Sequence, residues 1–349
     1  MGMVALYVAS NEPHAGKTLA CVALGLRWRE QGRTVGYLKP ISPYEGQPED
    51  EDAMFVALQL GLPAVPAHVC PVILTPEVAA EGAEAARRRV TDAFAAAAAG
   101  KEVMLIGGSG SALTRGATLG LSGREVANLL EARVLVMAKC ATFADLDSIV
   151  ATVRSLAGRV SGVALTRTPR KEIPEAKRAI IPALEREGVT VLGLLPEDPV
   201  LNSVSVREMA EATGARFLAC PEAAEELVEN LVVGAMSVES ALRFFRQTPR
   251  KCVVTGGDRG DVQLAALETP TKCLVLTGDL RPSHIVLERA TQLGVPVLLV
   301  MGDTLSTVAT LEGLLGNLSL REPAKARYAQ TQFEAHVDLA ALEAALGLT

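Results

Sequence analysis

Residues 4–18 read VALYVASNEPHAGKT, an apolar run of strand length followed by a short loop and a Gly-Lys-Thr triplet. We expect a helix to begin at Leu19. In such a unit, backbone N–H groups and the helix N-terminus surround a polyphosphate, the lysine neutralises charge and the threonine hydroxyl ligates Mg²⁺. The residues expected to hold a nucleotide are Ser10, Asn11, Glu12, Pro13, His14, Ala15, Gly16, Lys17 and Thr18, with Thr18 also on the metal.

The match to a phosphate-binding loop lacks its usual first glycine. That position falls on Asn11, or on Ser10 if the loop is one residue longer. A chance Gly-Lys-Thr triplet at a helix start is the alternative interpretation. The preceding strand favours nucleotide binding, which does not by itself imply hydrolysis.

The composition of the chain fits a two-domain α/β protein. Its 349 residues are 49% hydrophobic but only 3% aromatic, so we expect a core of Ala, Val and Leu, as in helix-covered parallel sheets. The net charge of −6 offers no basic surface to nucleic acid or to an anionic membrane. Scattered cysteines, no signal-peptide pattern and no apolar run of about 20 residues predict free thiols and a cytoplasmic location.

Strand-length apolar runs alternate with helix-period segments through the first part of the chain. This alternation is typical of βαβ units and predicts a doubly wound parallel sheet. The expected strands are Val4–Ala9, Val35–Lys39, Val103–Ile106, Val134–Ala138, Val160–Leu165 and Val189–Leu194. The expected helices are Leu19–Gln31, Asp52–Leu60, Val78–Ala99, Gly123–Glu131, Asp145–Leu156 and Ile173–Glu187.

A second group of alternating segments predicts a smaller α/β domain. Its expected strands are Lys251–Thr255, Lys272–Thr277 and Val295–Met301. Its expected helices are Val238–Phe245, Val262–Leu267, Ile285–Leu293 and Leu305–Leu314. We predict a nucleotide-binding domain over residues 1–212, the second domain over 213–322 and a helical tail over 323–349.

Phosphoryl chemistry at the first site needs carboxylates besides the loop. Lys39 ends the second expected strand, and the acidic run 49–52 opens the next helix at the edge where ligands bind open α/β sheets. We expect Asp50 or Asp52 to touch a metal; the alternative is that these acids only complement the helix dipole. The third expected strand is followed by Gly107-Gly108, so the second carboxylate of a metal site is missing. This absence argues against efficient ATP-driven chemistry.

The first half resembles the dethiobiotin-synthetase-like P-loop domain in the order of its loop, its Lys39-Pro40 strand end and its Asp52-Ala53 helix start. The resemblance implies ATP and Mg²⁺ as cofactors, with Lys17 on phosphate and Thr18 and Asp52 on the metal. It also implies that Lys39 meets an anionic substrate, so the catalytic residues would be Lys17 and Lys39. Two pairs depart from the family pattern. Gly107-Gly108 replaces Glu-Gly, and Thr166-Arg167 stands where an Asn-containing pair would read adenine.

Three strand ends of the second domain carry glycine, aspartate and hydroxyl residues, over 255–261, 277–283 and 301–304. They predict one polar edge that binds a nucleotide-like ligand; the alternative is ordinary turns with capping aspartates. The stretch 257–263 with Leu276-Thr277-Gly278 resembles the DRTGG domain, although Asp279 replaces its second glycine. The residues of this predicted ligand site or interface are Gly257, Asp258, Arg259, Asp261, Thr277 and Gly278.

The combination of both domains resembles the N-terminal regulatory half of long phosphate acetyltransferases, as a stand-alone protein without their catalytic domain. It implies a nucleotide-binding regulatory or sensor protein, weak or inactive in ATP hydrolysis, that forms a homodimer through the second domain. No acetyl transfer is expected. An ATP-dependent ligase or carboxylase is one alternative, and a regulatory subunit that acts with a separate acetyltransferase catalytic chain is another.

Overall fold

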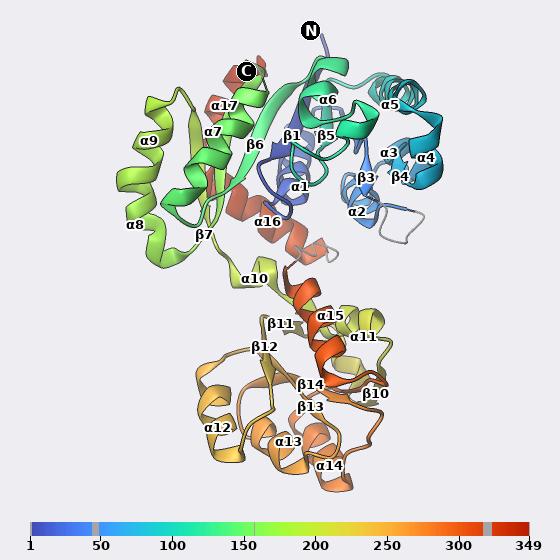
Figure 1. The fold of residues 1–349 in the computed structure, drawn as a ribbon, viewed down its shortest axis with the longest axis vertical. Coiled ribbons are helices and arrows are strands. Elements are labelled where there is room, and N and C mark those ends of the chain that lie inside the picture. Colours follow the sequence, from blue (N-terminus) through green and yellow to red (C-terminus); the bar gives the residue numbers. More distant parts are fainter. Residues whose placement is uncertain (1, 44–48, 157, 317–322, 349) are drawn as a thin grey trace. The chain divides into compact units, whose positions relative to one another are not determined.

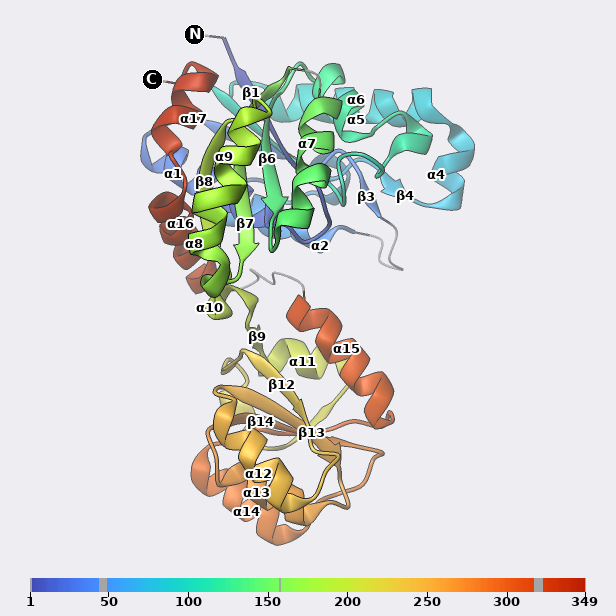
Figure 2. The ribbon, with the colours of Figure 1, turned by 60° about the vertical axis from the view of Figure 1, so that its left-hand side comes forward.

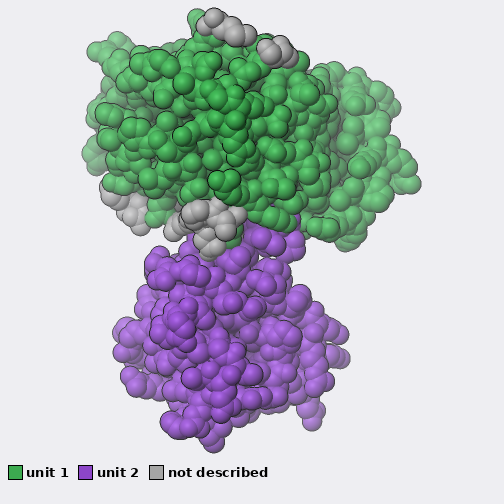
Figure 3. All heavy atoms as spheres, turned by 180° about the vertical axis from the view of Figure 1, so that it is seen from behind, with its two compact units in different colours: residues 1–197, 320–349 green, residues 198–319 purple. Residues whose placement is uncertain are grey.

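The computed structural model describes residues 2–43, 49–156, 158–316 and 323–348. The chain forms two compact units, which Figure 3 colours separately. The first unit contains residues 1–197 and 320–349, and the second contains residues 198–319. The second unit is therefore inserted in the sequence of the first.

The first unit is built on six parallel strands in the order β2-β5-β1-β6-β7-β8 (Figure 1). All six strands expected from the apolar runs are present. Their bounds are β1 Val4–Ser10, β2 Val35–Leu38, β5 Val103–Gly107, β6 Arg133–Lys139, β7 Val160–Thr168 and β8 Val191–Pro196. A separate two-stranded ribbon pairs β3 (Ser42–Pro43) with β4 (Ile73–Leu74).

Alternate strand residues bury against helices on opposite faces of this sheet, as the period of two requires. Tyr7, Ile106 and Val136 point to the face covered by α5 (Ala83–Ala98), α6 (Gly123–Leu129), α7 (Leu146–Ser155) and α9 (Ile181–Arg186). The opposite face is covered by α1 (Lys17–Glu30), α16 (Pro323–His336) and α17 (Leu339–Leu346) (Figure 2). Four shorter helices occur in the connections between strands along the chain. They are α2 Glu51–Gln59, α3 Pro66–Val69, α4 Pro76–Glu81 and α8 Ile173–Glu175.

Two expected helices are broken in the structure. The helix expected over 78–99 is split into α4 and α5 at Gly82, whose φ of 88° lies outside the helical region. The helix expected over 173–187 contains a π-helical turn at Ala176–Ile180. Pro182 follows that turn and has no N–H to donate to the preceding turn, so the backbone widens there.

The second unit is built on a five-stranded sheet in the order β10-β15-β14-β13-β12. Its strands are β10 Arg216–Ala219, β12 Asn230–Val233, β13 Lys251–Gly256, β14 Thr271–Thr277 and β15 Val297–Leu299. All pair in parallel except β10, which pairs antiparallel with β15. Neither β10 nor β12 is among the strands expected from the sequence. One face carries α12 (Val238–Gln247), α13 (Gly260–Leu267) and α14 (His284–Leu293), and the other carries α11 (Val206–Thr213) and α15 (Thr304–Gly316).

The second unit begins at Asp198, upstream of the boundary expected at residue 212. The reason is packing: Val206 and Met209 of α11 are buried with Cys252 and Val254 of β13. The same stretch contains α10 (Pro199–Asn202) and β9 (Val204–Ser205), and β9 pairs with β11 (Leu227–Val228). The other expected boundary, at residue 322, lies outside the described residues.

All six cysteines are buried and free, as the sequence predicts. Burial raises the pKa of the Cys21 thiol to about 12, so this group stays protonated at neutral pH. Among the helices that the structure describes, none is long and apolar enough to cross a membrane.

The C-terminal helices α16 and α17 return to the first unit and pack on α1. Glu343 of α17 accepts hydrogen bonds from Arg27 Nε at 2.9 Å and from Trp28 Nε1 at 3.1 Å. Trp28 is fully buried. Although burial alone would raise the pKa of the Glu343 carboxyl, these donors hold it below its usual value. The predicted helical tail is therefore part of the body that carries the phosphate loop.

We expect Glu343→Ala to lower the free energy of unfolding of the first unit by about 1–3 kcal/mol, because it leaves a buried indole N–H without an acceptor. Trp28 is the only tryptophan, so its fluorescence reports unfolding by denaturant. Glu334→Ala is the control: this carboxylate lies 3.7 Å from Arg27 and is about a third exposed. Its loss is expected to cost about 0.5 kcal/mol or less. Equal effects of the two variants would contradict the role given to Glu343.

Candidate functional site

The loop between β1 and α1 presents an open helix N-terminus. Gly16 precedes α1 with φ of 91°, a left-handed conformation that glycine adopts without strain. No described side chain caps α1, and its first turn contains no acid. The first N–H groups of α1 and the positive end of its dipole are thus free of protein anions, which is the arrangement that binds phosphate.

Asn11, at one of the two positions where the usual first glycine could fall, has a structural role. Its side-chain oxygen accepts from Lys139 N at 2.9 Å, and its nitrogen donates to Lys139 O at 3.2 Å and to Ser148 Oγ at 3.0 Å. Asn11 is buried, so these bonds tie the loop firmly to the end of β6 and to α7. The sequence pattern had marked this residue as a departure without revealing its partners.

Lys17 points back into the loop region. Its Nζ donates to Ser10 Oγ at 2.8 Å and to Gly110 O at 2.9 Å. The pKa of Lys17 is lowered to about 8, chiefly by burial and then by the nearby positive charges of Lys39 and Arg115, against the opposing effect of Asp52. The ammonium group is therefore poorly neutralised by the protein and suited to an anionic ligand.

Lys39 and Asp50 form a buried ion pair of 2.6 Å between Nζ and Oδ2. Asp50 also accepts from Ser42 Oγ and caps α2 through Ala53 N at 2.7 Å. Burial opposes the charged form of Lys39, but Asp50 and Asp52 raise its pKa. Of the two candidate metal ligands, Asp50 is thus saturated by donors, whereas Asp52 is 59% exposed and 3.9 Å from Lys39.

The carboxyl ends of β1, β2 and β5 leave little room for a side chain after β5. A Cβ at Gly107 would lie 2.6 Å from the hydroxyl of Tyr37, and a Cβ at Gly108 would lie 2.6 Å from Val8 O. The missing acid is therefore part of the packing. In the described part of the chain, no group of three or more His, Cys, Asp or Glu side chains is placed to hold a metal ion.

Thr166, one of the two residues expected at the base of the nucleotide, contacts the backbone of the phosphate loop. The Thr166 hydroxyl donates to Ala15 O at 2.9 Å. Arg167 has a positive φ of 53°, and burial lowers its pKa, with Glu197 opposing this effect. Thr166 thus supports the phosphate loop, a role that the sequence did not indicate.

The predicted second site brings together the carboxyl ends of β13, β14 and β15. A Cβ at Gly257 would lie 1.6 Å from Leu280 O, so only glycine permits this contact between two loops. Thr277 Oγ1 lies 2.7 Å from Thr304 Oγ1, which joins the ends of β14 and α15. The loops at the three strand ends therefore pack against one another at a single edge of the sheet.

Most of the charged residues at this edge form contacts with other residues of the same edge. Arg259 donates to Met236 O at 3.1 Å and lies 3.4 Å from Asp261. The Oδ1 atom of Asp258 lies 2.5 Å from the position of a Cβ at Gly256. Gly278 has φ of 80° and provides the turn after β14. Gln263, which the sequence reading missed, is fully buried and donates to Gly256 O at 2.8 Å.

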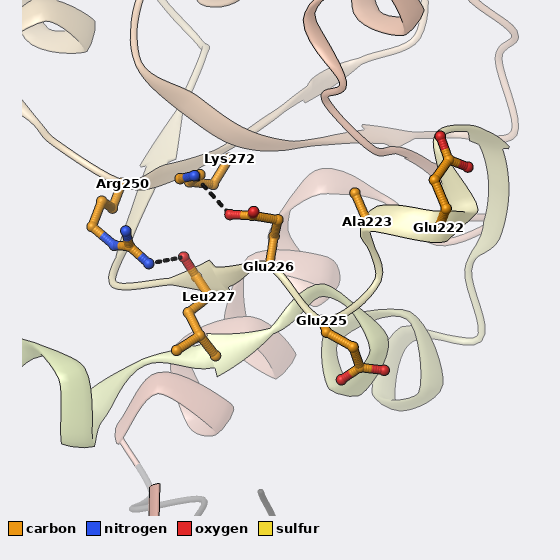
Figure 4. A pocket seen from close by; sticks show the side chains of 7 residues that line it. All are labelled: Glu222, Ala223, Glu225, Glu226, Leu227, Arg250 and Lys272. Atoms are coloured by element: carbon orange, nitrogen blue, oxygen red, sulfur yellow. Dashed lines mark hydrogen bonds and ion pairs between the residues drawn. The ribbon is translucent and has the colours of Figure 1, made fainter. Parts of the chain in front are cut away.

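A polar hollow of about 380 Å³ lies at the opposite, amino end of β13 and β14 (Figure 4). Its lining residues are Glu222, Ala223, Glu225, Glu226, Leu227, Arg250 and Lys272. Lys272 pairs with Glu226 at 2.6 Å, and Arg250 pairs with Glu229 at 2.6 Å. Both basic groups are therefore already neutralised.

Comparison with known proteins agrees with this architecture. The family described as "AAA domain" matches residues 4–205, and the family described as "DRTGG domain" matches residues 208–314. A phosphate acetyltransferase of Pseudomonas putida is 25% identical over 371 residues, which covers 99% of this chain and 52% of the relative. A phosphate acetyltransferase of Nitratidesulfovibrio vulgaris is 29% identical over 185 residues, which covers 48% of this chain and 26% of that relative. The chain thus spans about half the length of its relatives or less.

Among solved structures, the regulatory region of Clostridium perfringens pyrophosphatase, with its CBS and DRTGG domains complexed with diadenosine tetraphosphate, is similar at 16% identity. The similarity covers 40% of this chain and 68% of that one, with a TM-score of 0.30.

We expect binding of ATP to take up protons near pH 8. Lys17 has a lowered pKa of about 8 in the free protein, and a bound anion favours its charged form, so affinity should fall as pH rises from 7 to 9. Calorimetry in buffers of different ionisation enthalpy measures the uptake. In the Lys17→Arg variant the side chain stays charged, so this variant should bind ATP without taking up a proton. Affinity that is constant over this range in the wild type would contradict the assignment.

Proposed function

Because the chain belongs to the AAA domain family and carries a DRTGG domain after it, we propose that it is a nucleotide-binding regulatory protein with weak or no ATP hydrolysis. The first unit takes ATP or another nucleotide at residues 10–18. The observation that carries this proposal is the uncapped, acid-free N-terminus of α1, with Lys17 beside it. The backbone N–H groups bind the phosphates, and Lys17 neutralises their charge.

Weak hydrolysis follows from the end of β5. Acceleration of phosphoryl transfer depends on positioned charges around the reacting phosphate and water. At Gly107 the space for an acidic side chain is filled by the Tyr37 hydroxyl. Asp50, a buried carboxylate, is bound to Lys39 and to the N-terminus of α2. A protein that binds a nucleotide without hydrolysing it is suited to sense the concentration of that nucleotide.

One alternative function is an ATP-dependent ligase or carboxylase. The observation that favours it is Lys39, whose charged form is maintained by two aspartates at the carboxyl edge of the sheet. In that function Lys39 would hold an anionic substrate and Lys17 the reacting phosphate. ATP turnover that is fast only in the presence of a small carboxylate or amine would favour this alternative.

The regulated partner is proposed from homology. The chain is homologous to phosphate acetyltransferases, so a separate acetyltransferase catalytic chain is a candidate partner. We also propose a homodimer through the second unit. Apolar side chains are exposed beside the carboxyl ends of β14 and β15, with Leu280 48%, Met301 79% and Leu305 81% exposed. Arg216 and Asp279 pair at 2.9 Å near this patch.

We expect Leu305→Glu to convert a dimer to a monomer in equilibrium sedimentation, because a carboxylate would be buried without a partner in the interface. Leu58→Glu is the matched control, since Leu58 is 63% exposed in the first unit. A wild-type protein that remains monomeric at high concentration would refute the dimer.

We expect Lys17→Ala to weaken ATP binding roughly 10- to 100-fold in calorimetry, which corresponds to a lost charge-assisted hydrogen bond of about 1.5–3 kcal/mol. Lys139→Ala is the control. This lysine is half-exposed at the same edge and pairs with Glu12 at 3.4 Å, so its loss should change affinity less than about 3-fold. If millimolar ATP did not bind, or if both variants behaved alike, the proposed nucleotide site would be wrong.

A further inference from the structure

The side chain of Asn11 continues the contact between β1 and β6 beyond the end of their pairing. The last paired residues of these strands are Ser10 and Met137, so the N–H and C=O of Lys139 lie past the ladder. The Asn11 amide binds both of these groups, at 2.9 Å and 3.2 Å, and also donates to Ser148 Oγ at 3.0 Å. One side-chain amide thus holds the chain at the point where it leaves the sheet to form the phosphate loop.

The backbone of the loop does not need a glycine at position 11. The loop residues with a positive φ are His14, at 56°, and Gly16, at 91°. Asn11 is not one of them, so its φ lies in the range that any residue adopts. The glycine of the usual pattern would therefore remove the amide without relieving any strain at this position, and it would give the unbound loop more conformations.

Hydroxyl groups hold two carbonyl groups further along the loop. Ser10 Oγ donates to Glu12 O at 2.7 Å, and Thr166 Oγ1 donates to Ala15 O at 2.9 Å. Together with the bonds of Asn11, these contacts anchor the loop at its start, in its middle and just before α1. All of them are made by the protein itself. Ordering an unanchored loop at the moment of binding would instead cost conformational entropy and therefore affinity.

We propose that Asn11 is a positioning residue of the phosphate loop, and that restoring the usual glycine at this position weakens nucleotide binding. The inference rests on the nucleotide-binding function proposed above. Asn11 acts through the backbone, because its amide atoms are bound to Lys139 and Ser148. Without these bonds the loop is less ordered in the free protein, and arranging its N–H groups around a phosphate then lowers the affinity.

The test is calorimetric titration of ATP with Mg²⁺ into the full chain, well below the unfolding temperature. We expect Asn11→Gly to weaken binding roughly 10-fold. Asn11→Ala should weaken it by a similar or smaller factor, because alanine leaves the free loop fewer conformations than glycine. Ser148→Ala removes one of the three bonds and should cost about 3-fold or less. Hydrogen exchange at residues 14–16 should be faster in free Asn11→Gly than in the free wild type.

Two matched controls separate positioning of the loop from other effects. Lys139→Ala removes the side chain that pairs with Glu12 but keeps the backbone groups that bind Asn11. Glu343→Ala destabilises the same unit at the far end of α1, so it tests whether lost stability alone lowers the affinity. Both controls should bind ATP within about 3-fold of the wild type. Cooperative unfolding, followed by the fluorescence of Trp28, shows that each variant folds.

Several results would overturn the inference. If Asn11→Gly bound ATP as tightly as the wild type or more tightly, Asn11 would not position the loop, while the proposed nucleotide function would stand. The same conclusion would follow if Glu343→Ala weakened binding as much as Asn11→Gly, since lost stability would then explain both effects. If Asn11→Gly did not fold, a folded Asn11→Ala with wild-type affinity would be equally decisive. A wild type that does not bind ATP would overturn both the inference and the proposed function.

Discussion

The hydrogen bond from Lys17 to Gly110 O is the interaction on which the site depends, because it joins the phosphate loop to the loop after β5. These two loops can meet only where side chains are absent, and a Cβ at Gly108 would collide with Val8 O. The same closeness leaves little room for a side chain, and therefore for a carboxylate, at the end of β5.

The helix that begins at this loop is also fixed at its far end. Glu343 binds Arg27 and Trp28 on the last turns of α1, while Lys17 and Thr18 form the first turn. The tail that carries Glu343 follows the second unit in sequence, and the strand that precedes this unit, β8, belongs to the first sheet. Both chain connections of the second unit therefore lead into the body that carries the phosphate loop.

Local sequence signals predicted the fold better than the site. The strands of the first sheet were evident because each is a short apolar run, and the loop was evident from Gly16-Lys17-Thr18. The antiparallel strand β10 and the docking of α17 on α1 were missed, since they depend on contacts between residues far apart in the chain. The partners of Asn11 and Thr166, and the difference between Asp50 and Asp52, were hidden for the same reason.

We propose that the turn before α1 binds the polyphosphate of a nucleotide, with Lys17 neutralising part of its charge. A crystal structure of the full chain with a non-hydrolysable ATP analogue tests this directly. We expect phosphate density against the backbone N–H groups of residues 14–18, contacted by Lys17. A turn without phosphate in that crystal would contradict the proposed nucleotide site.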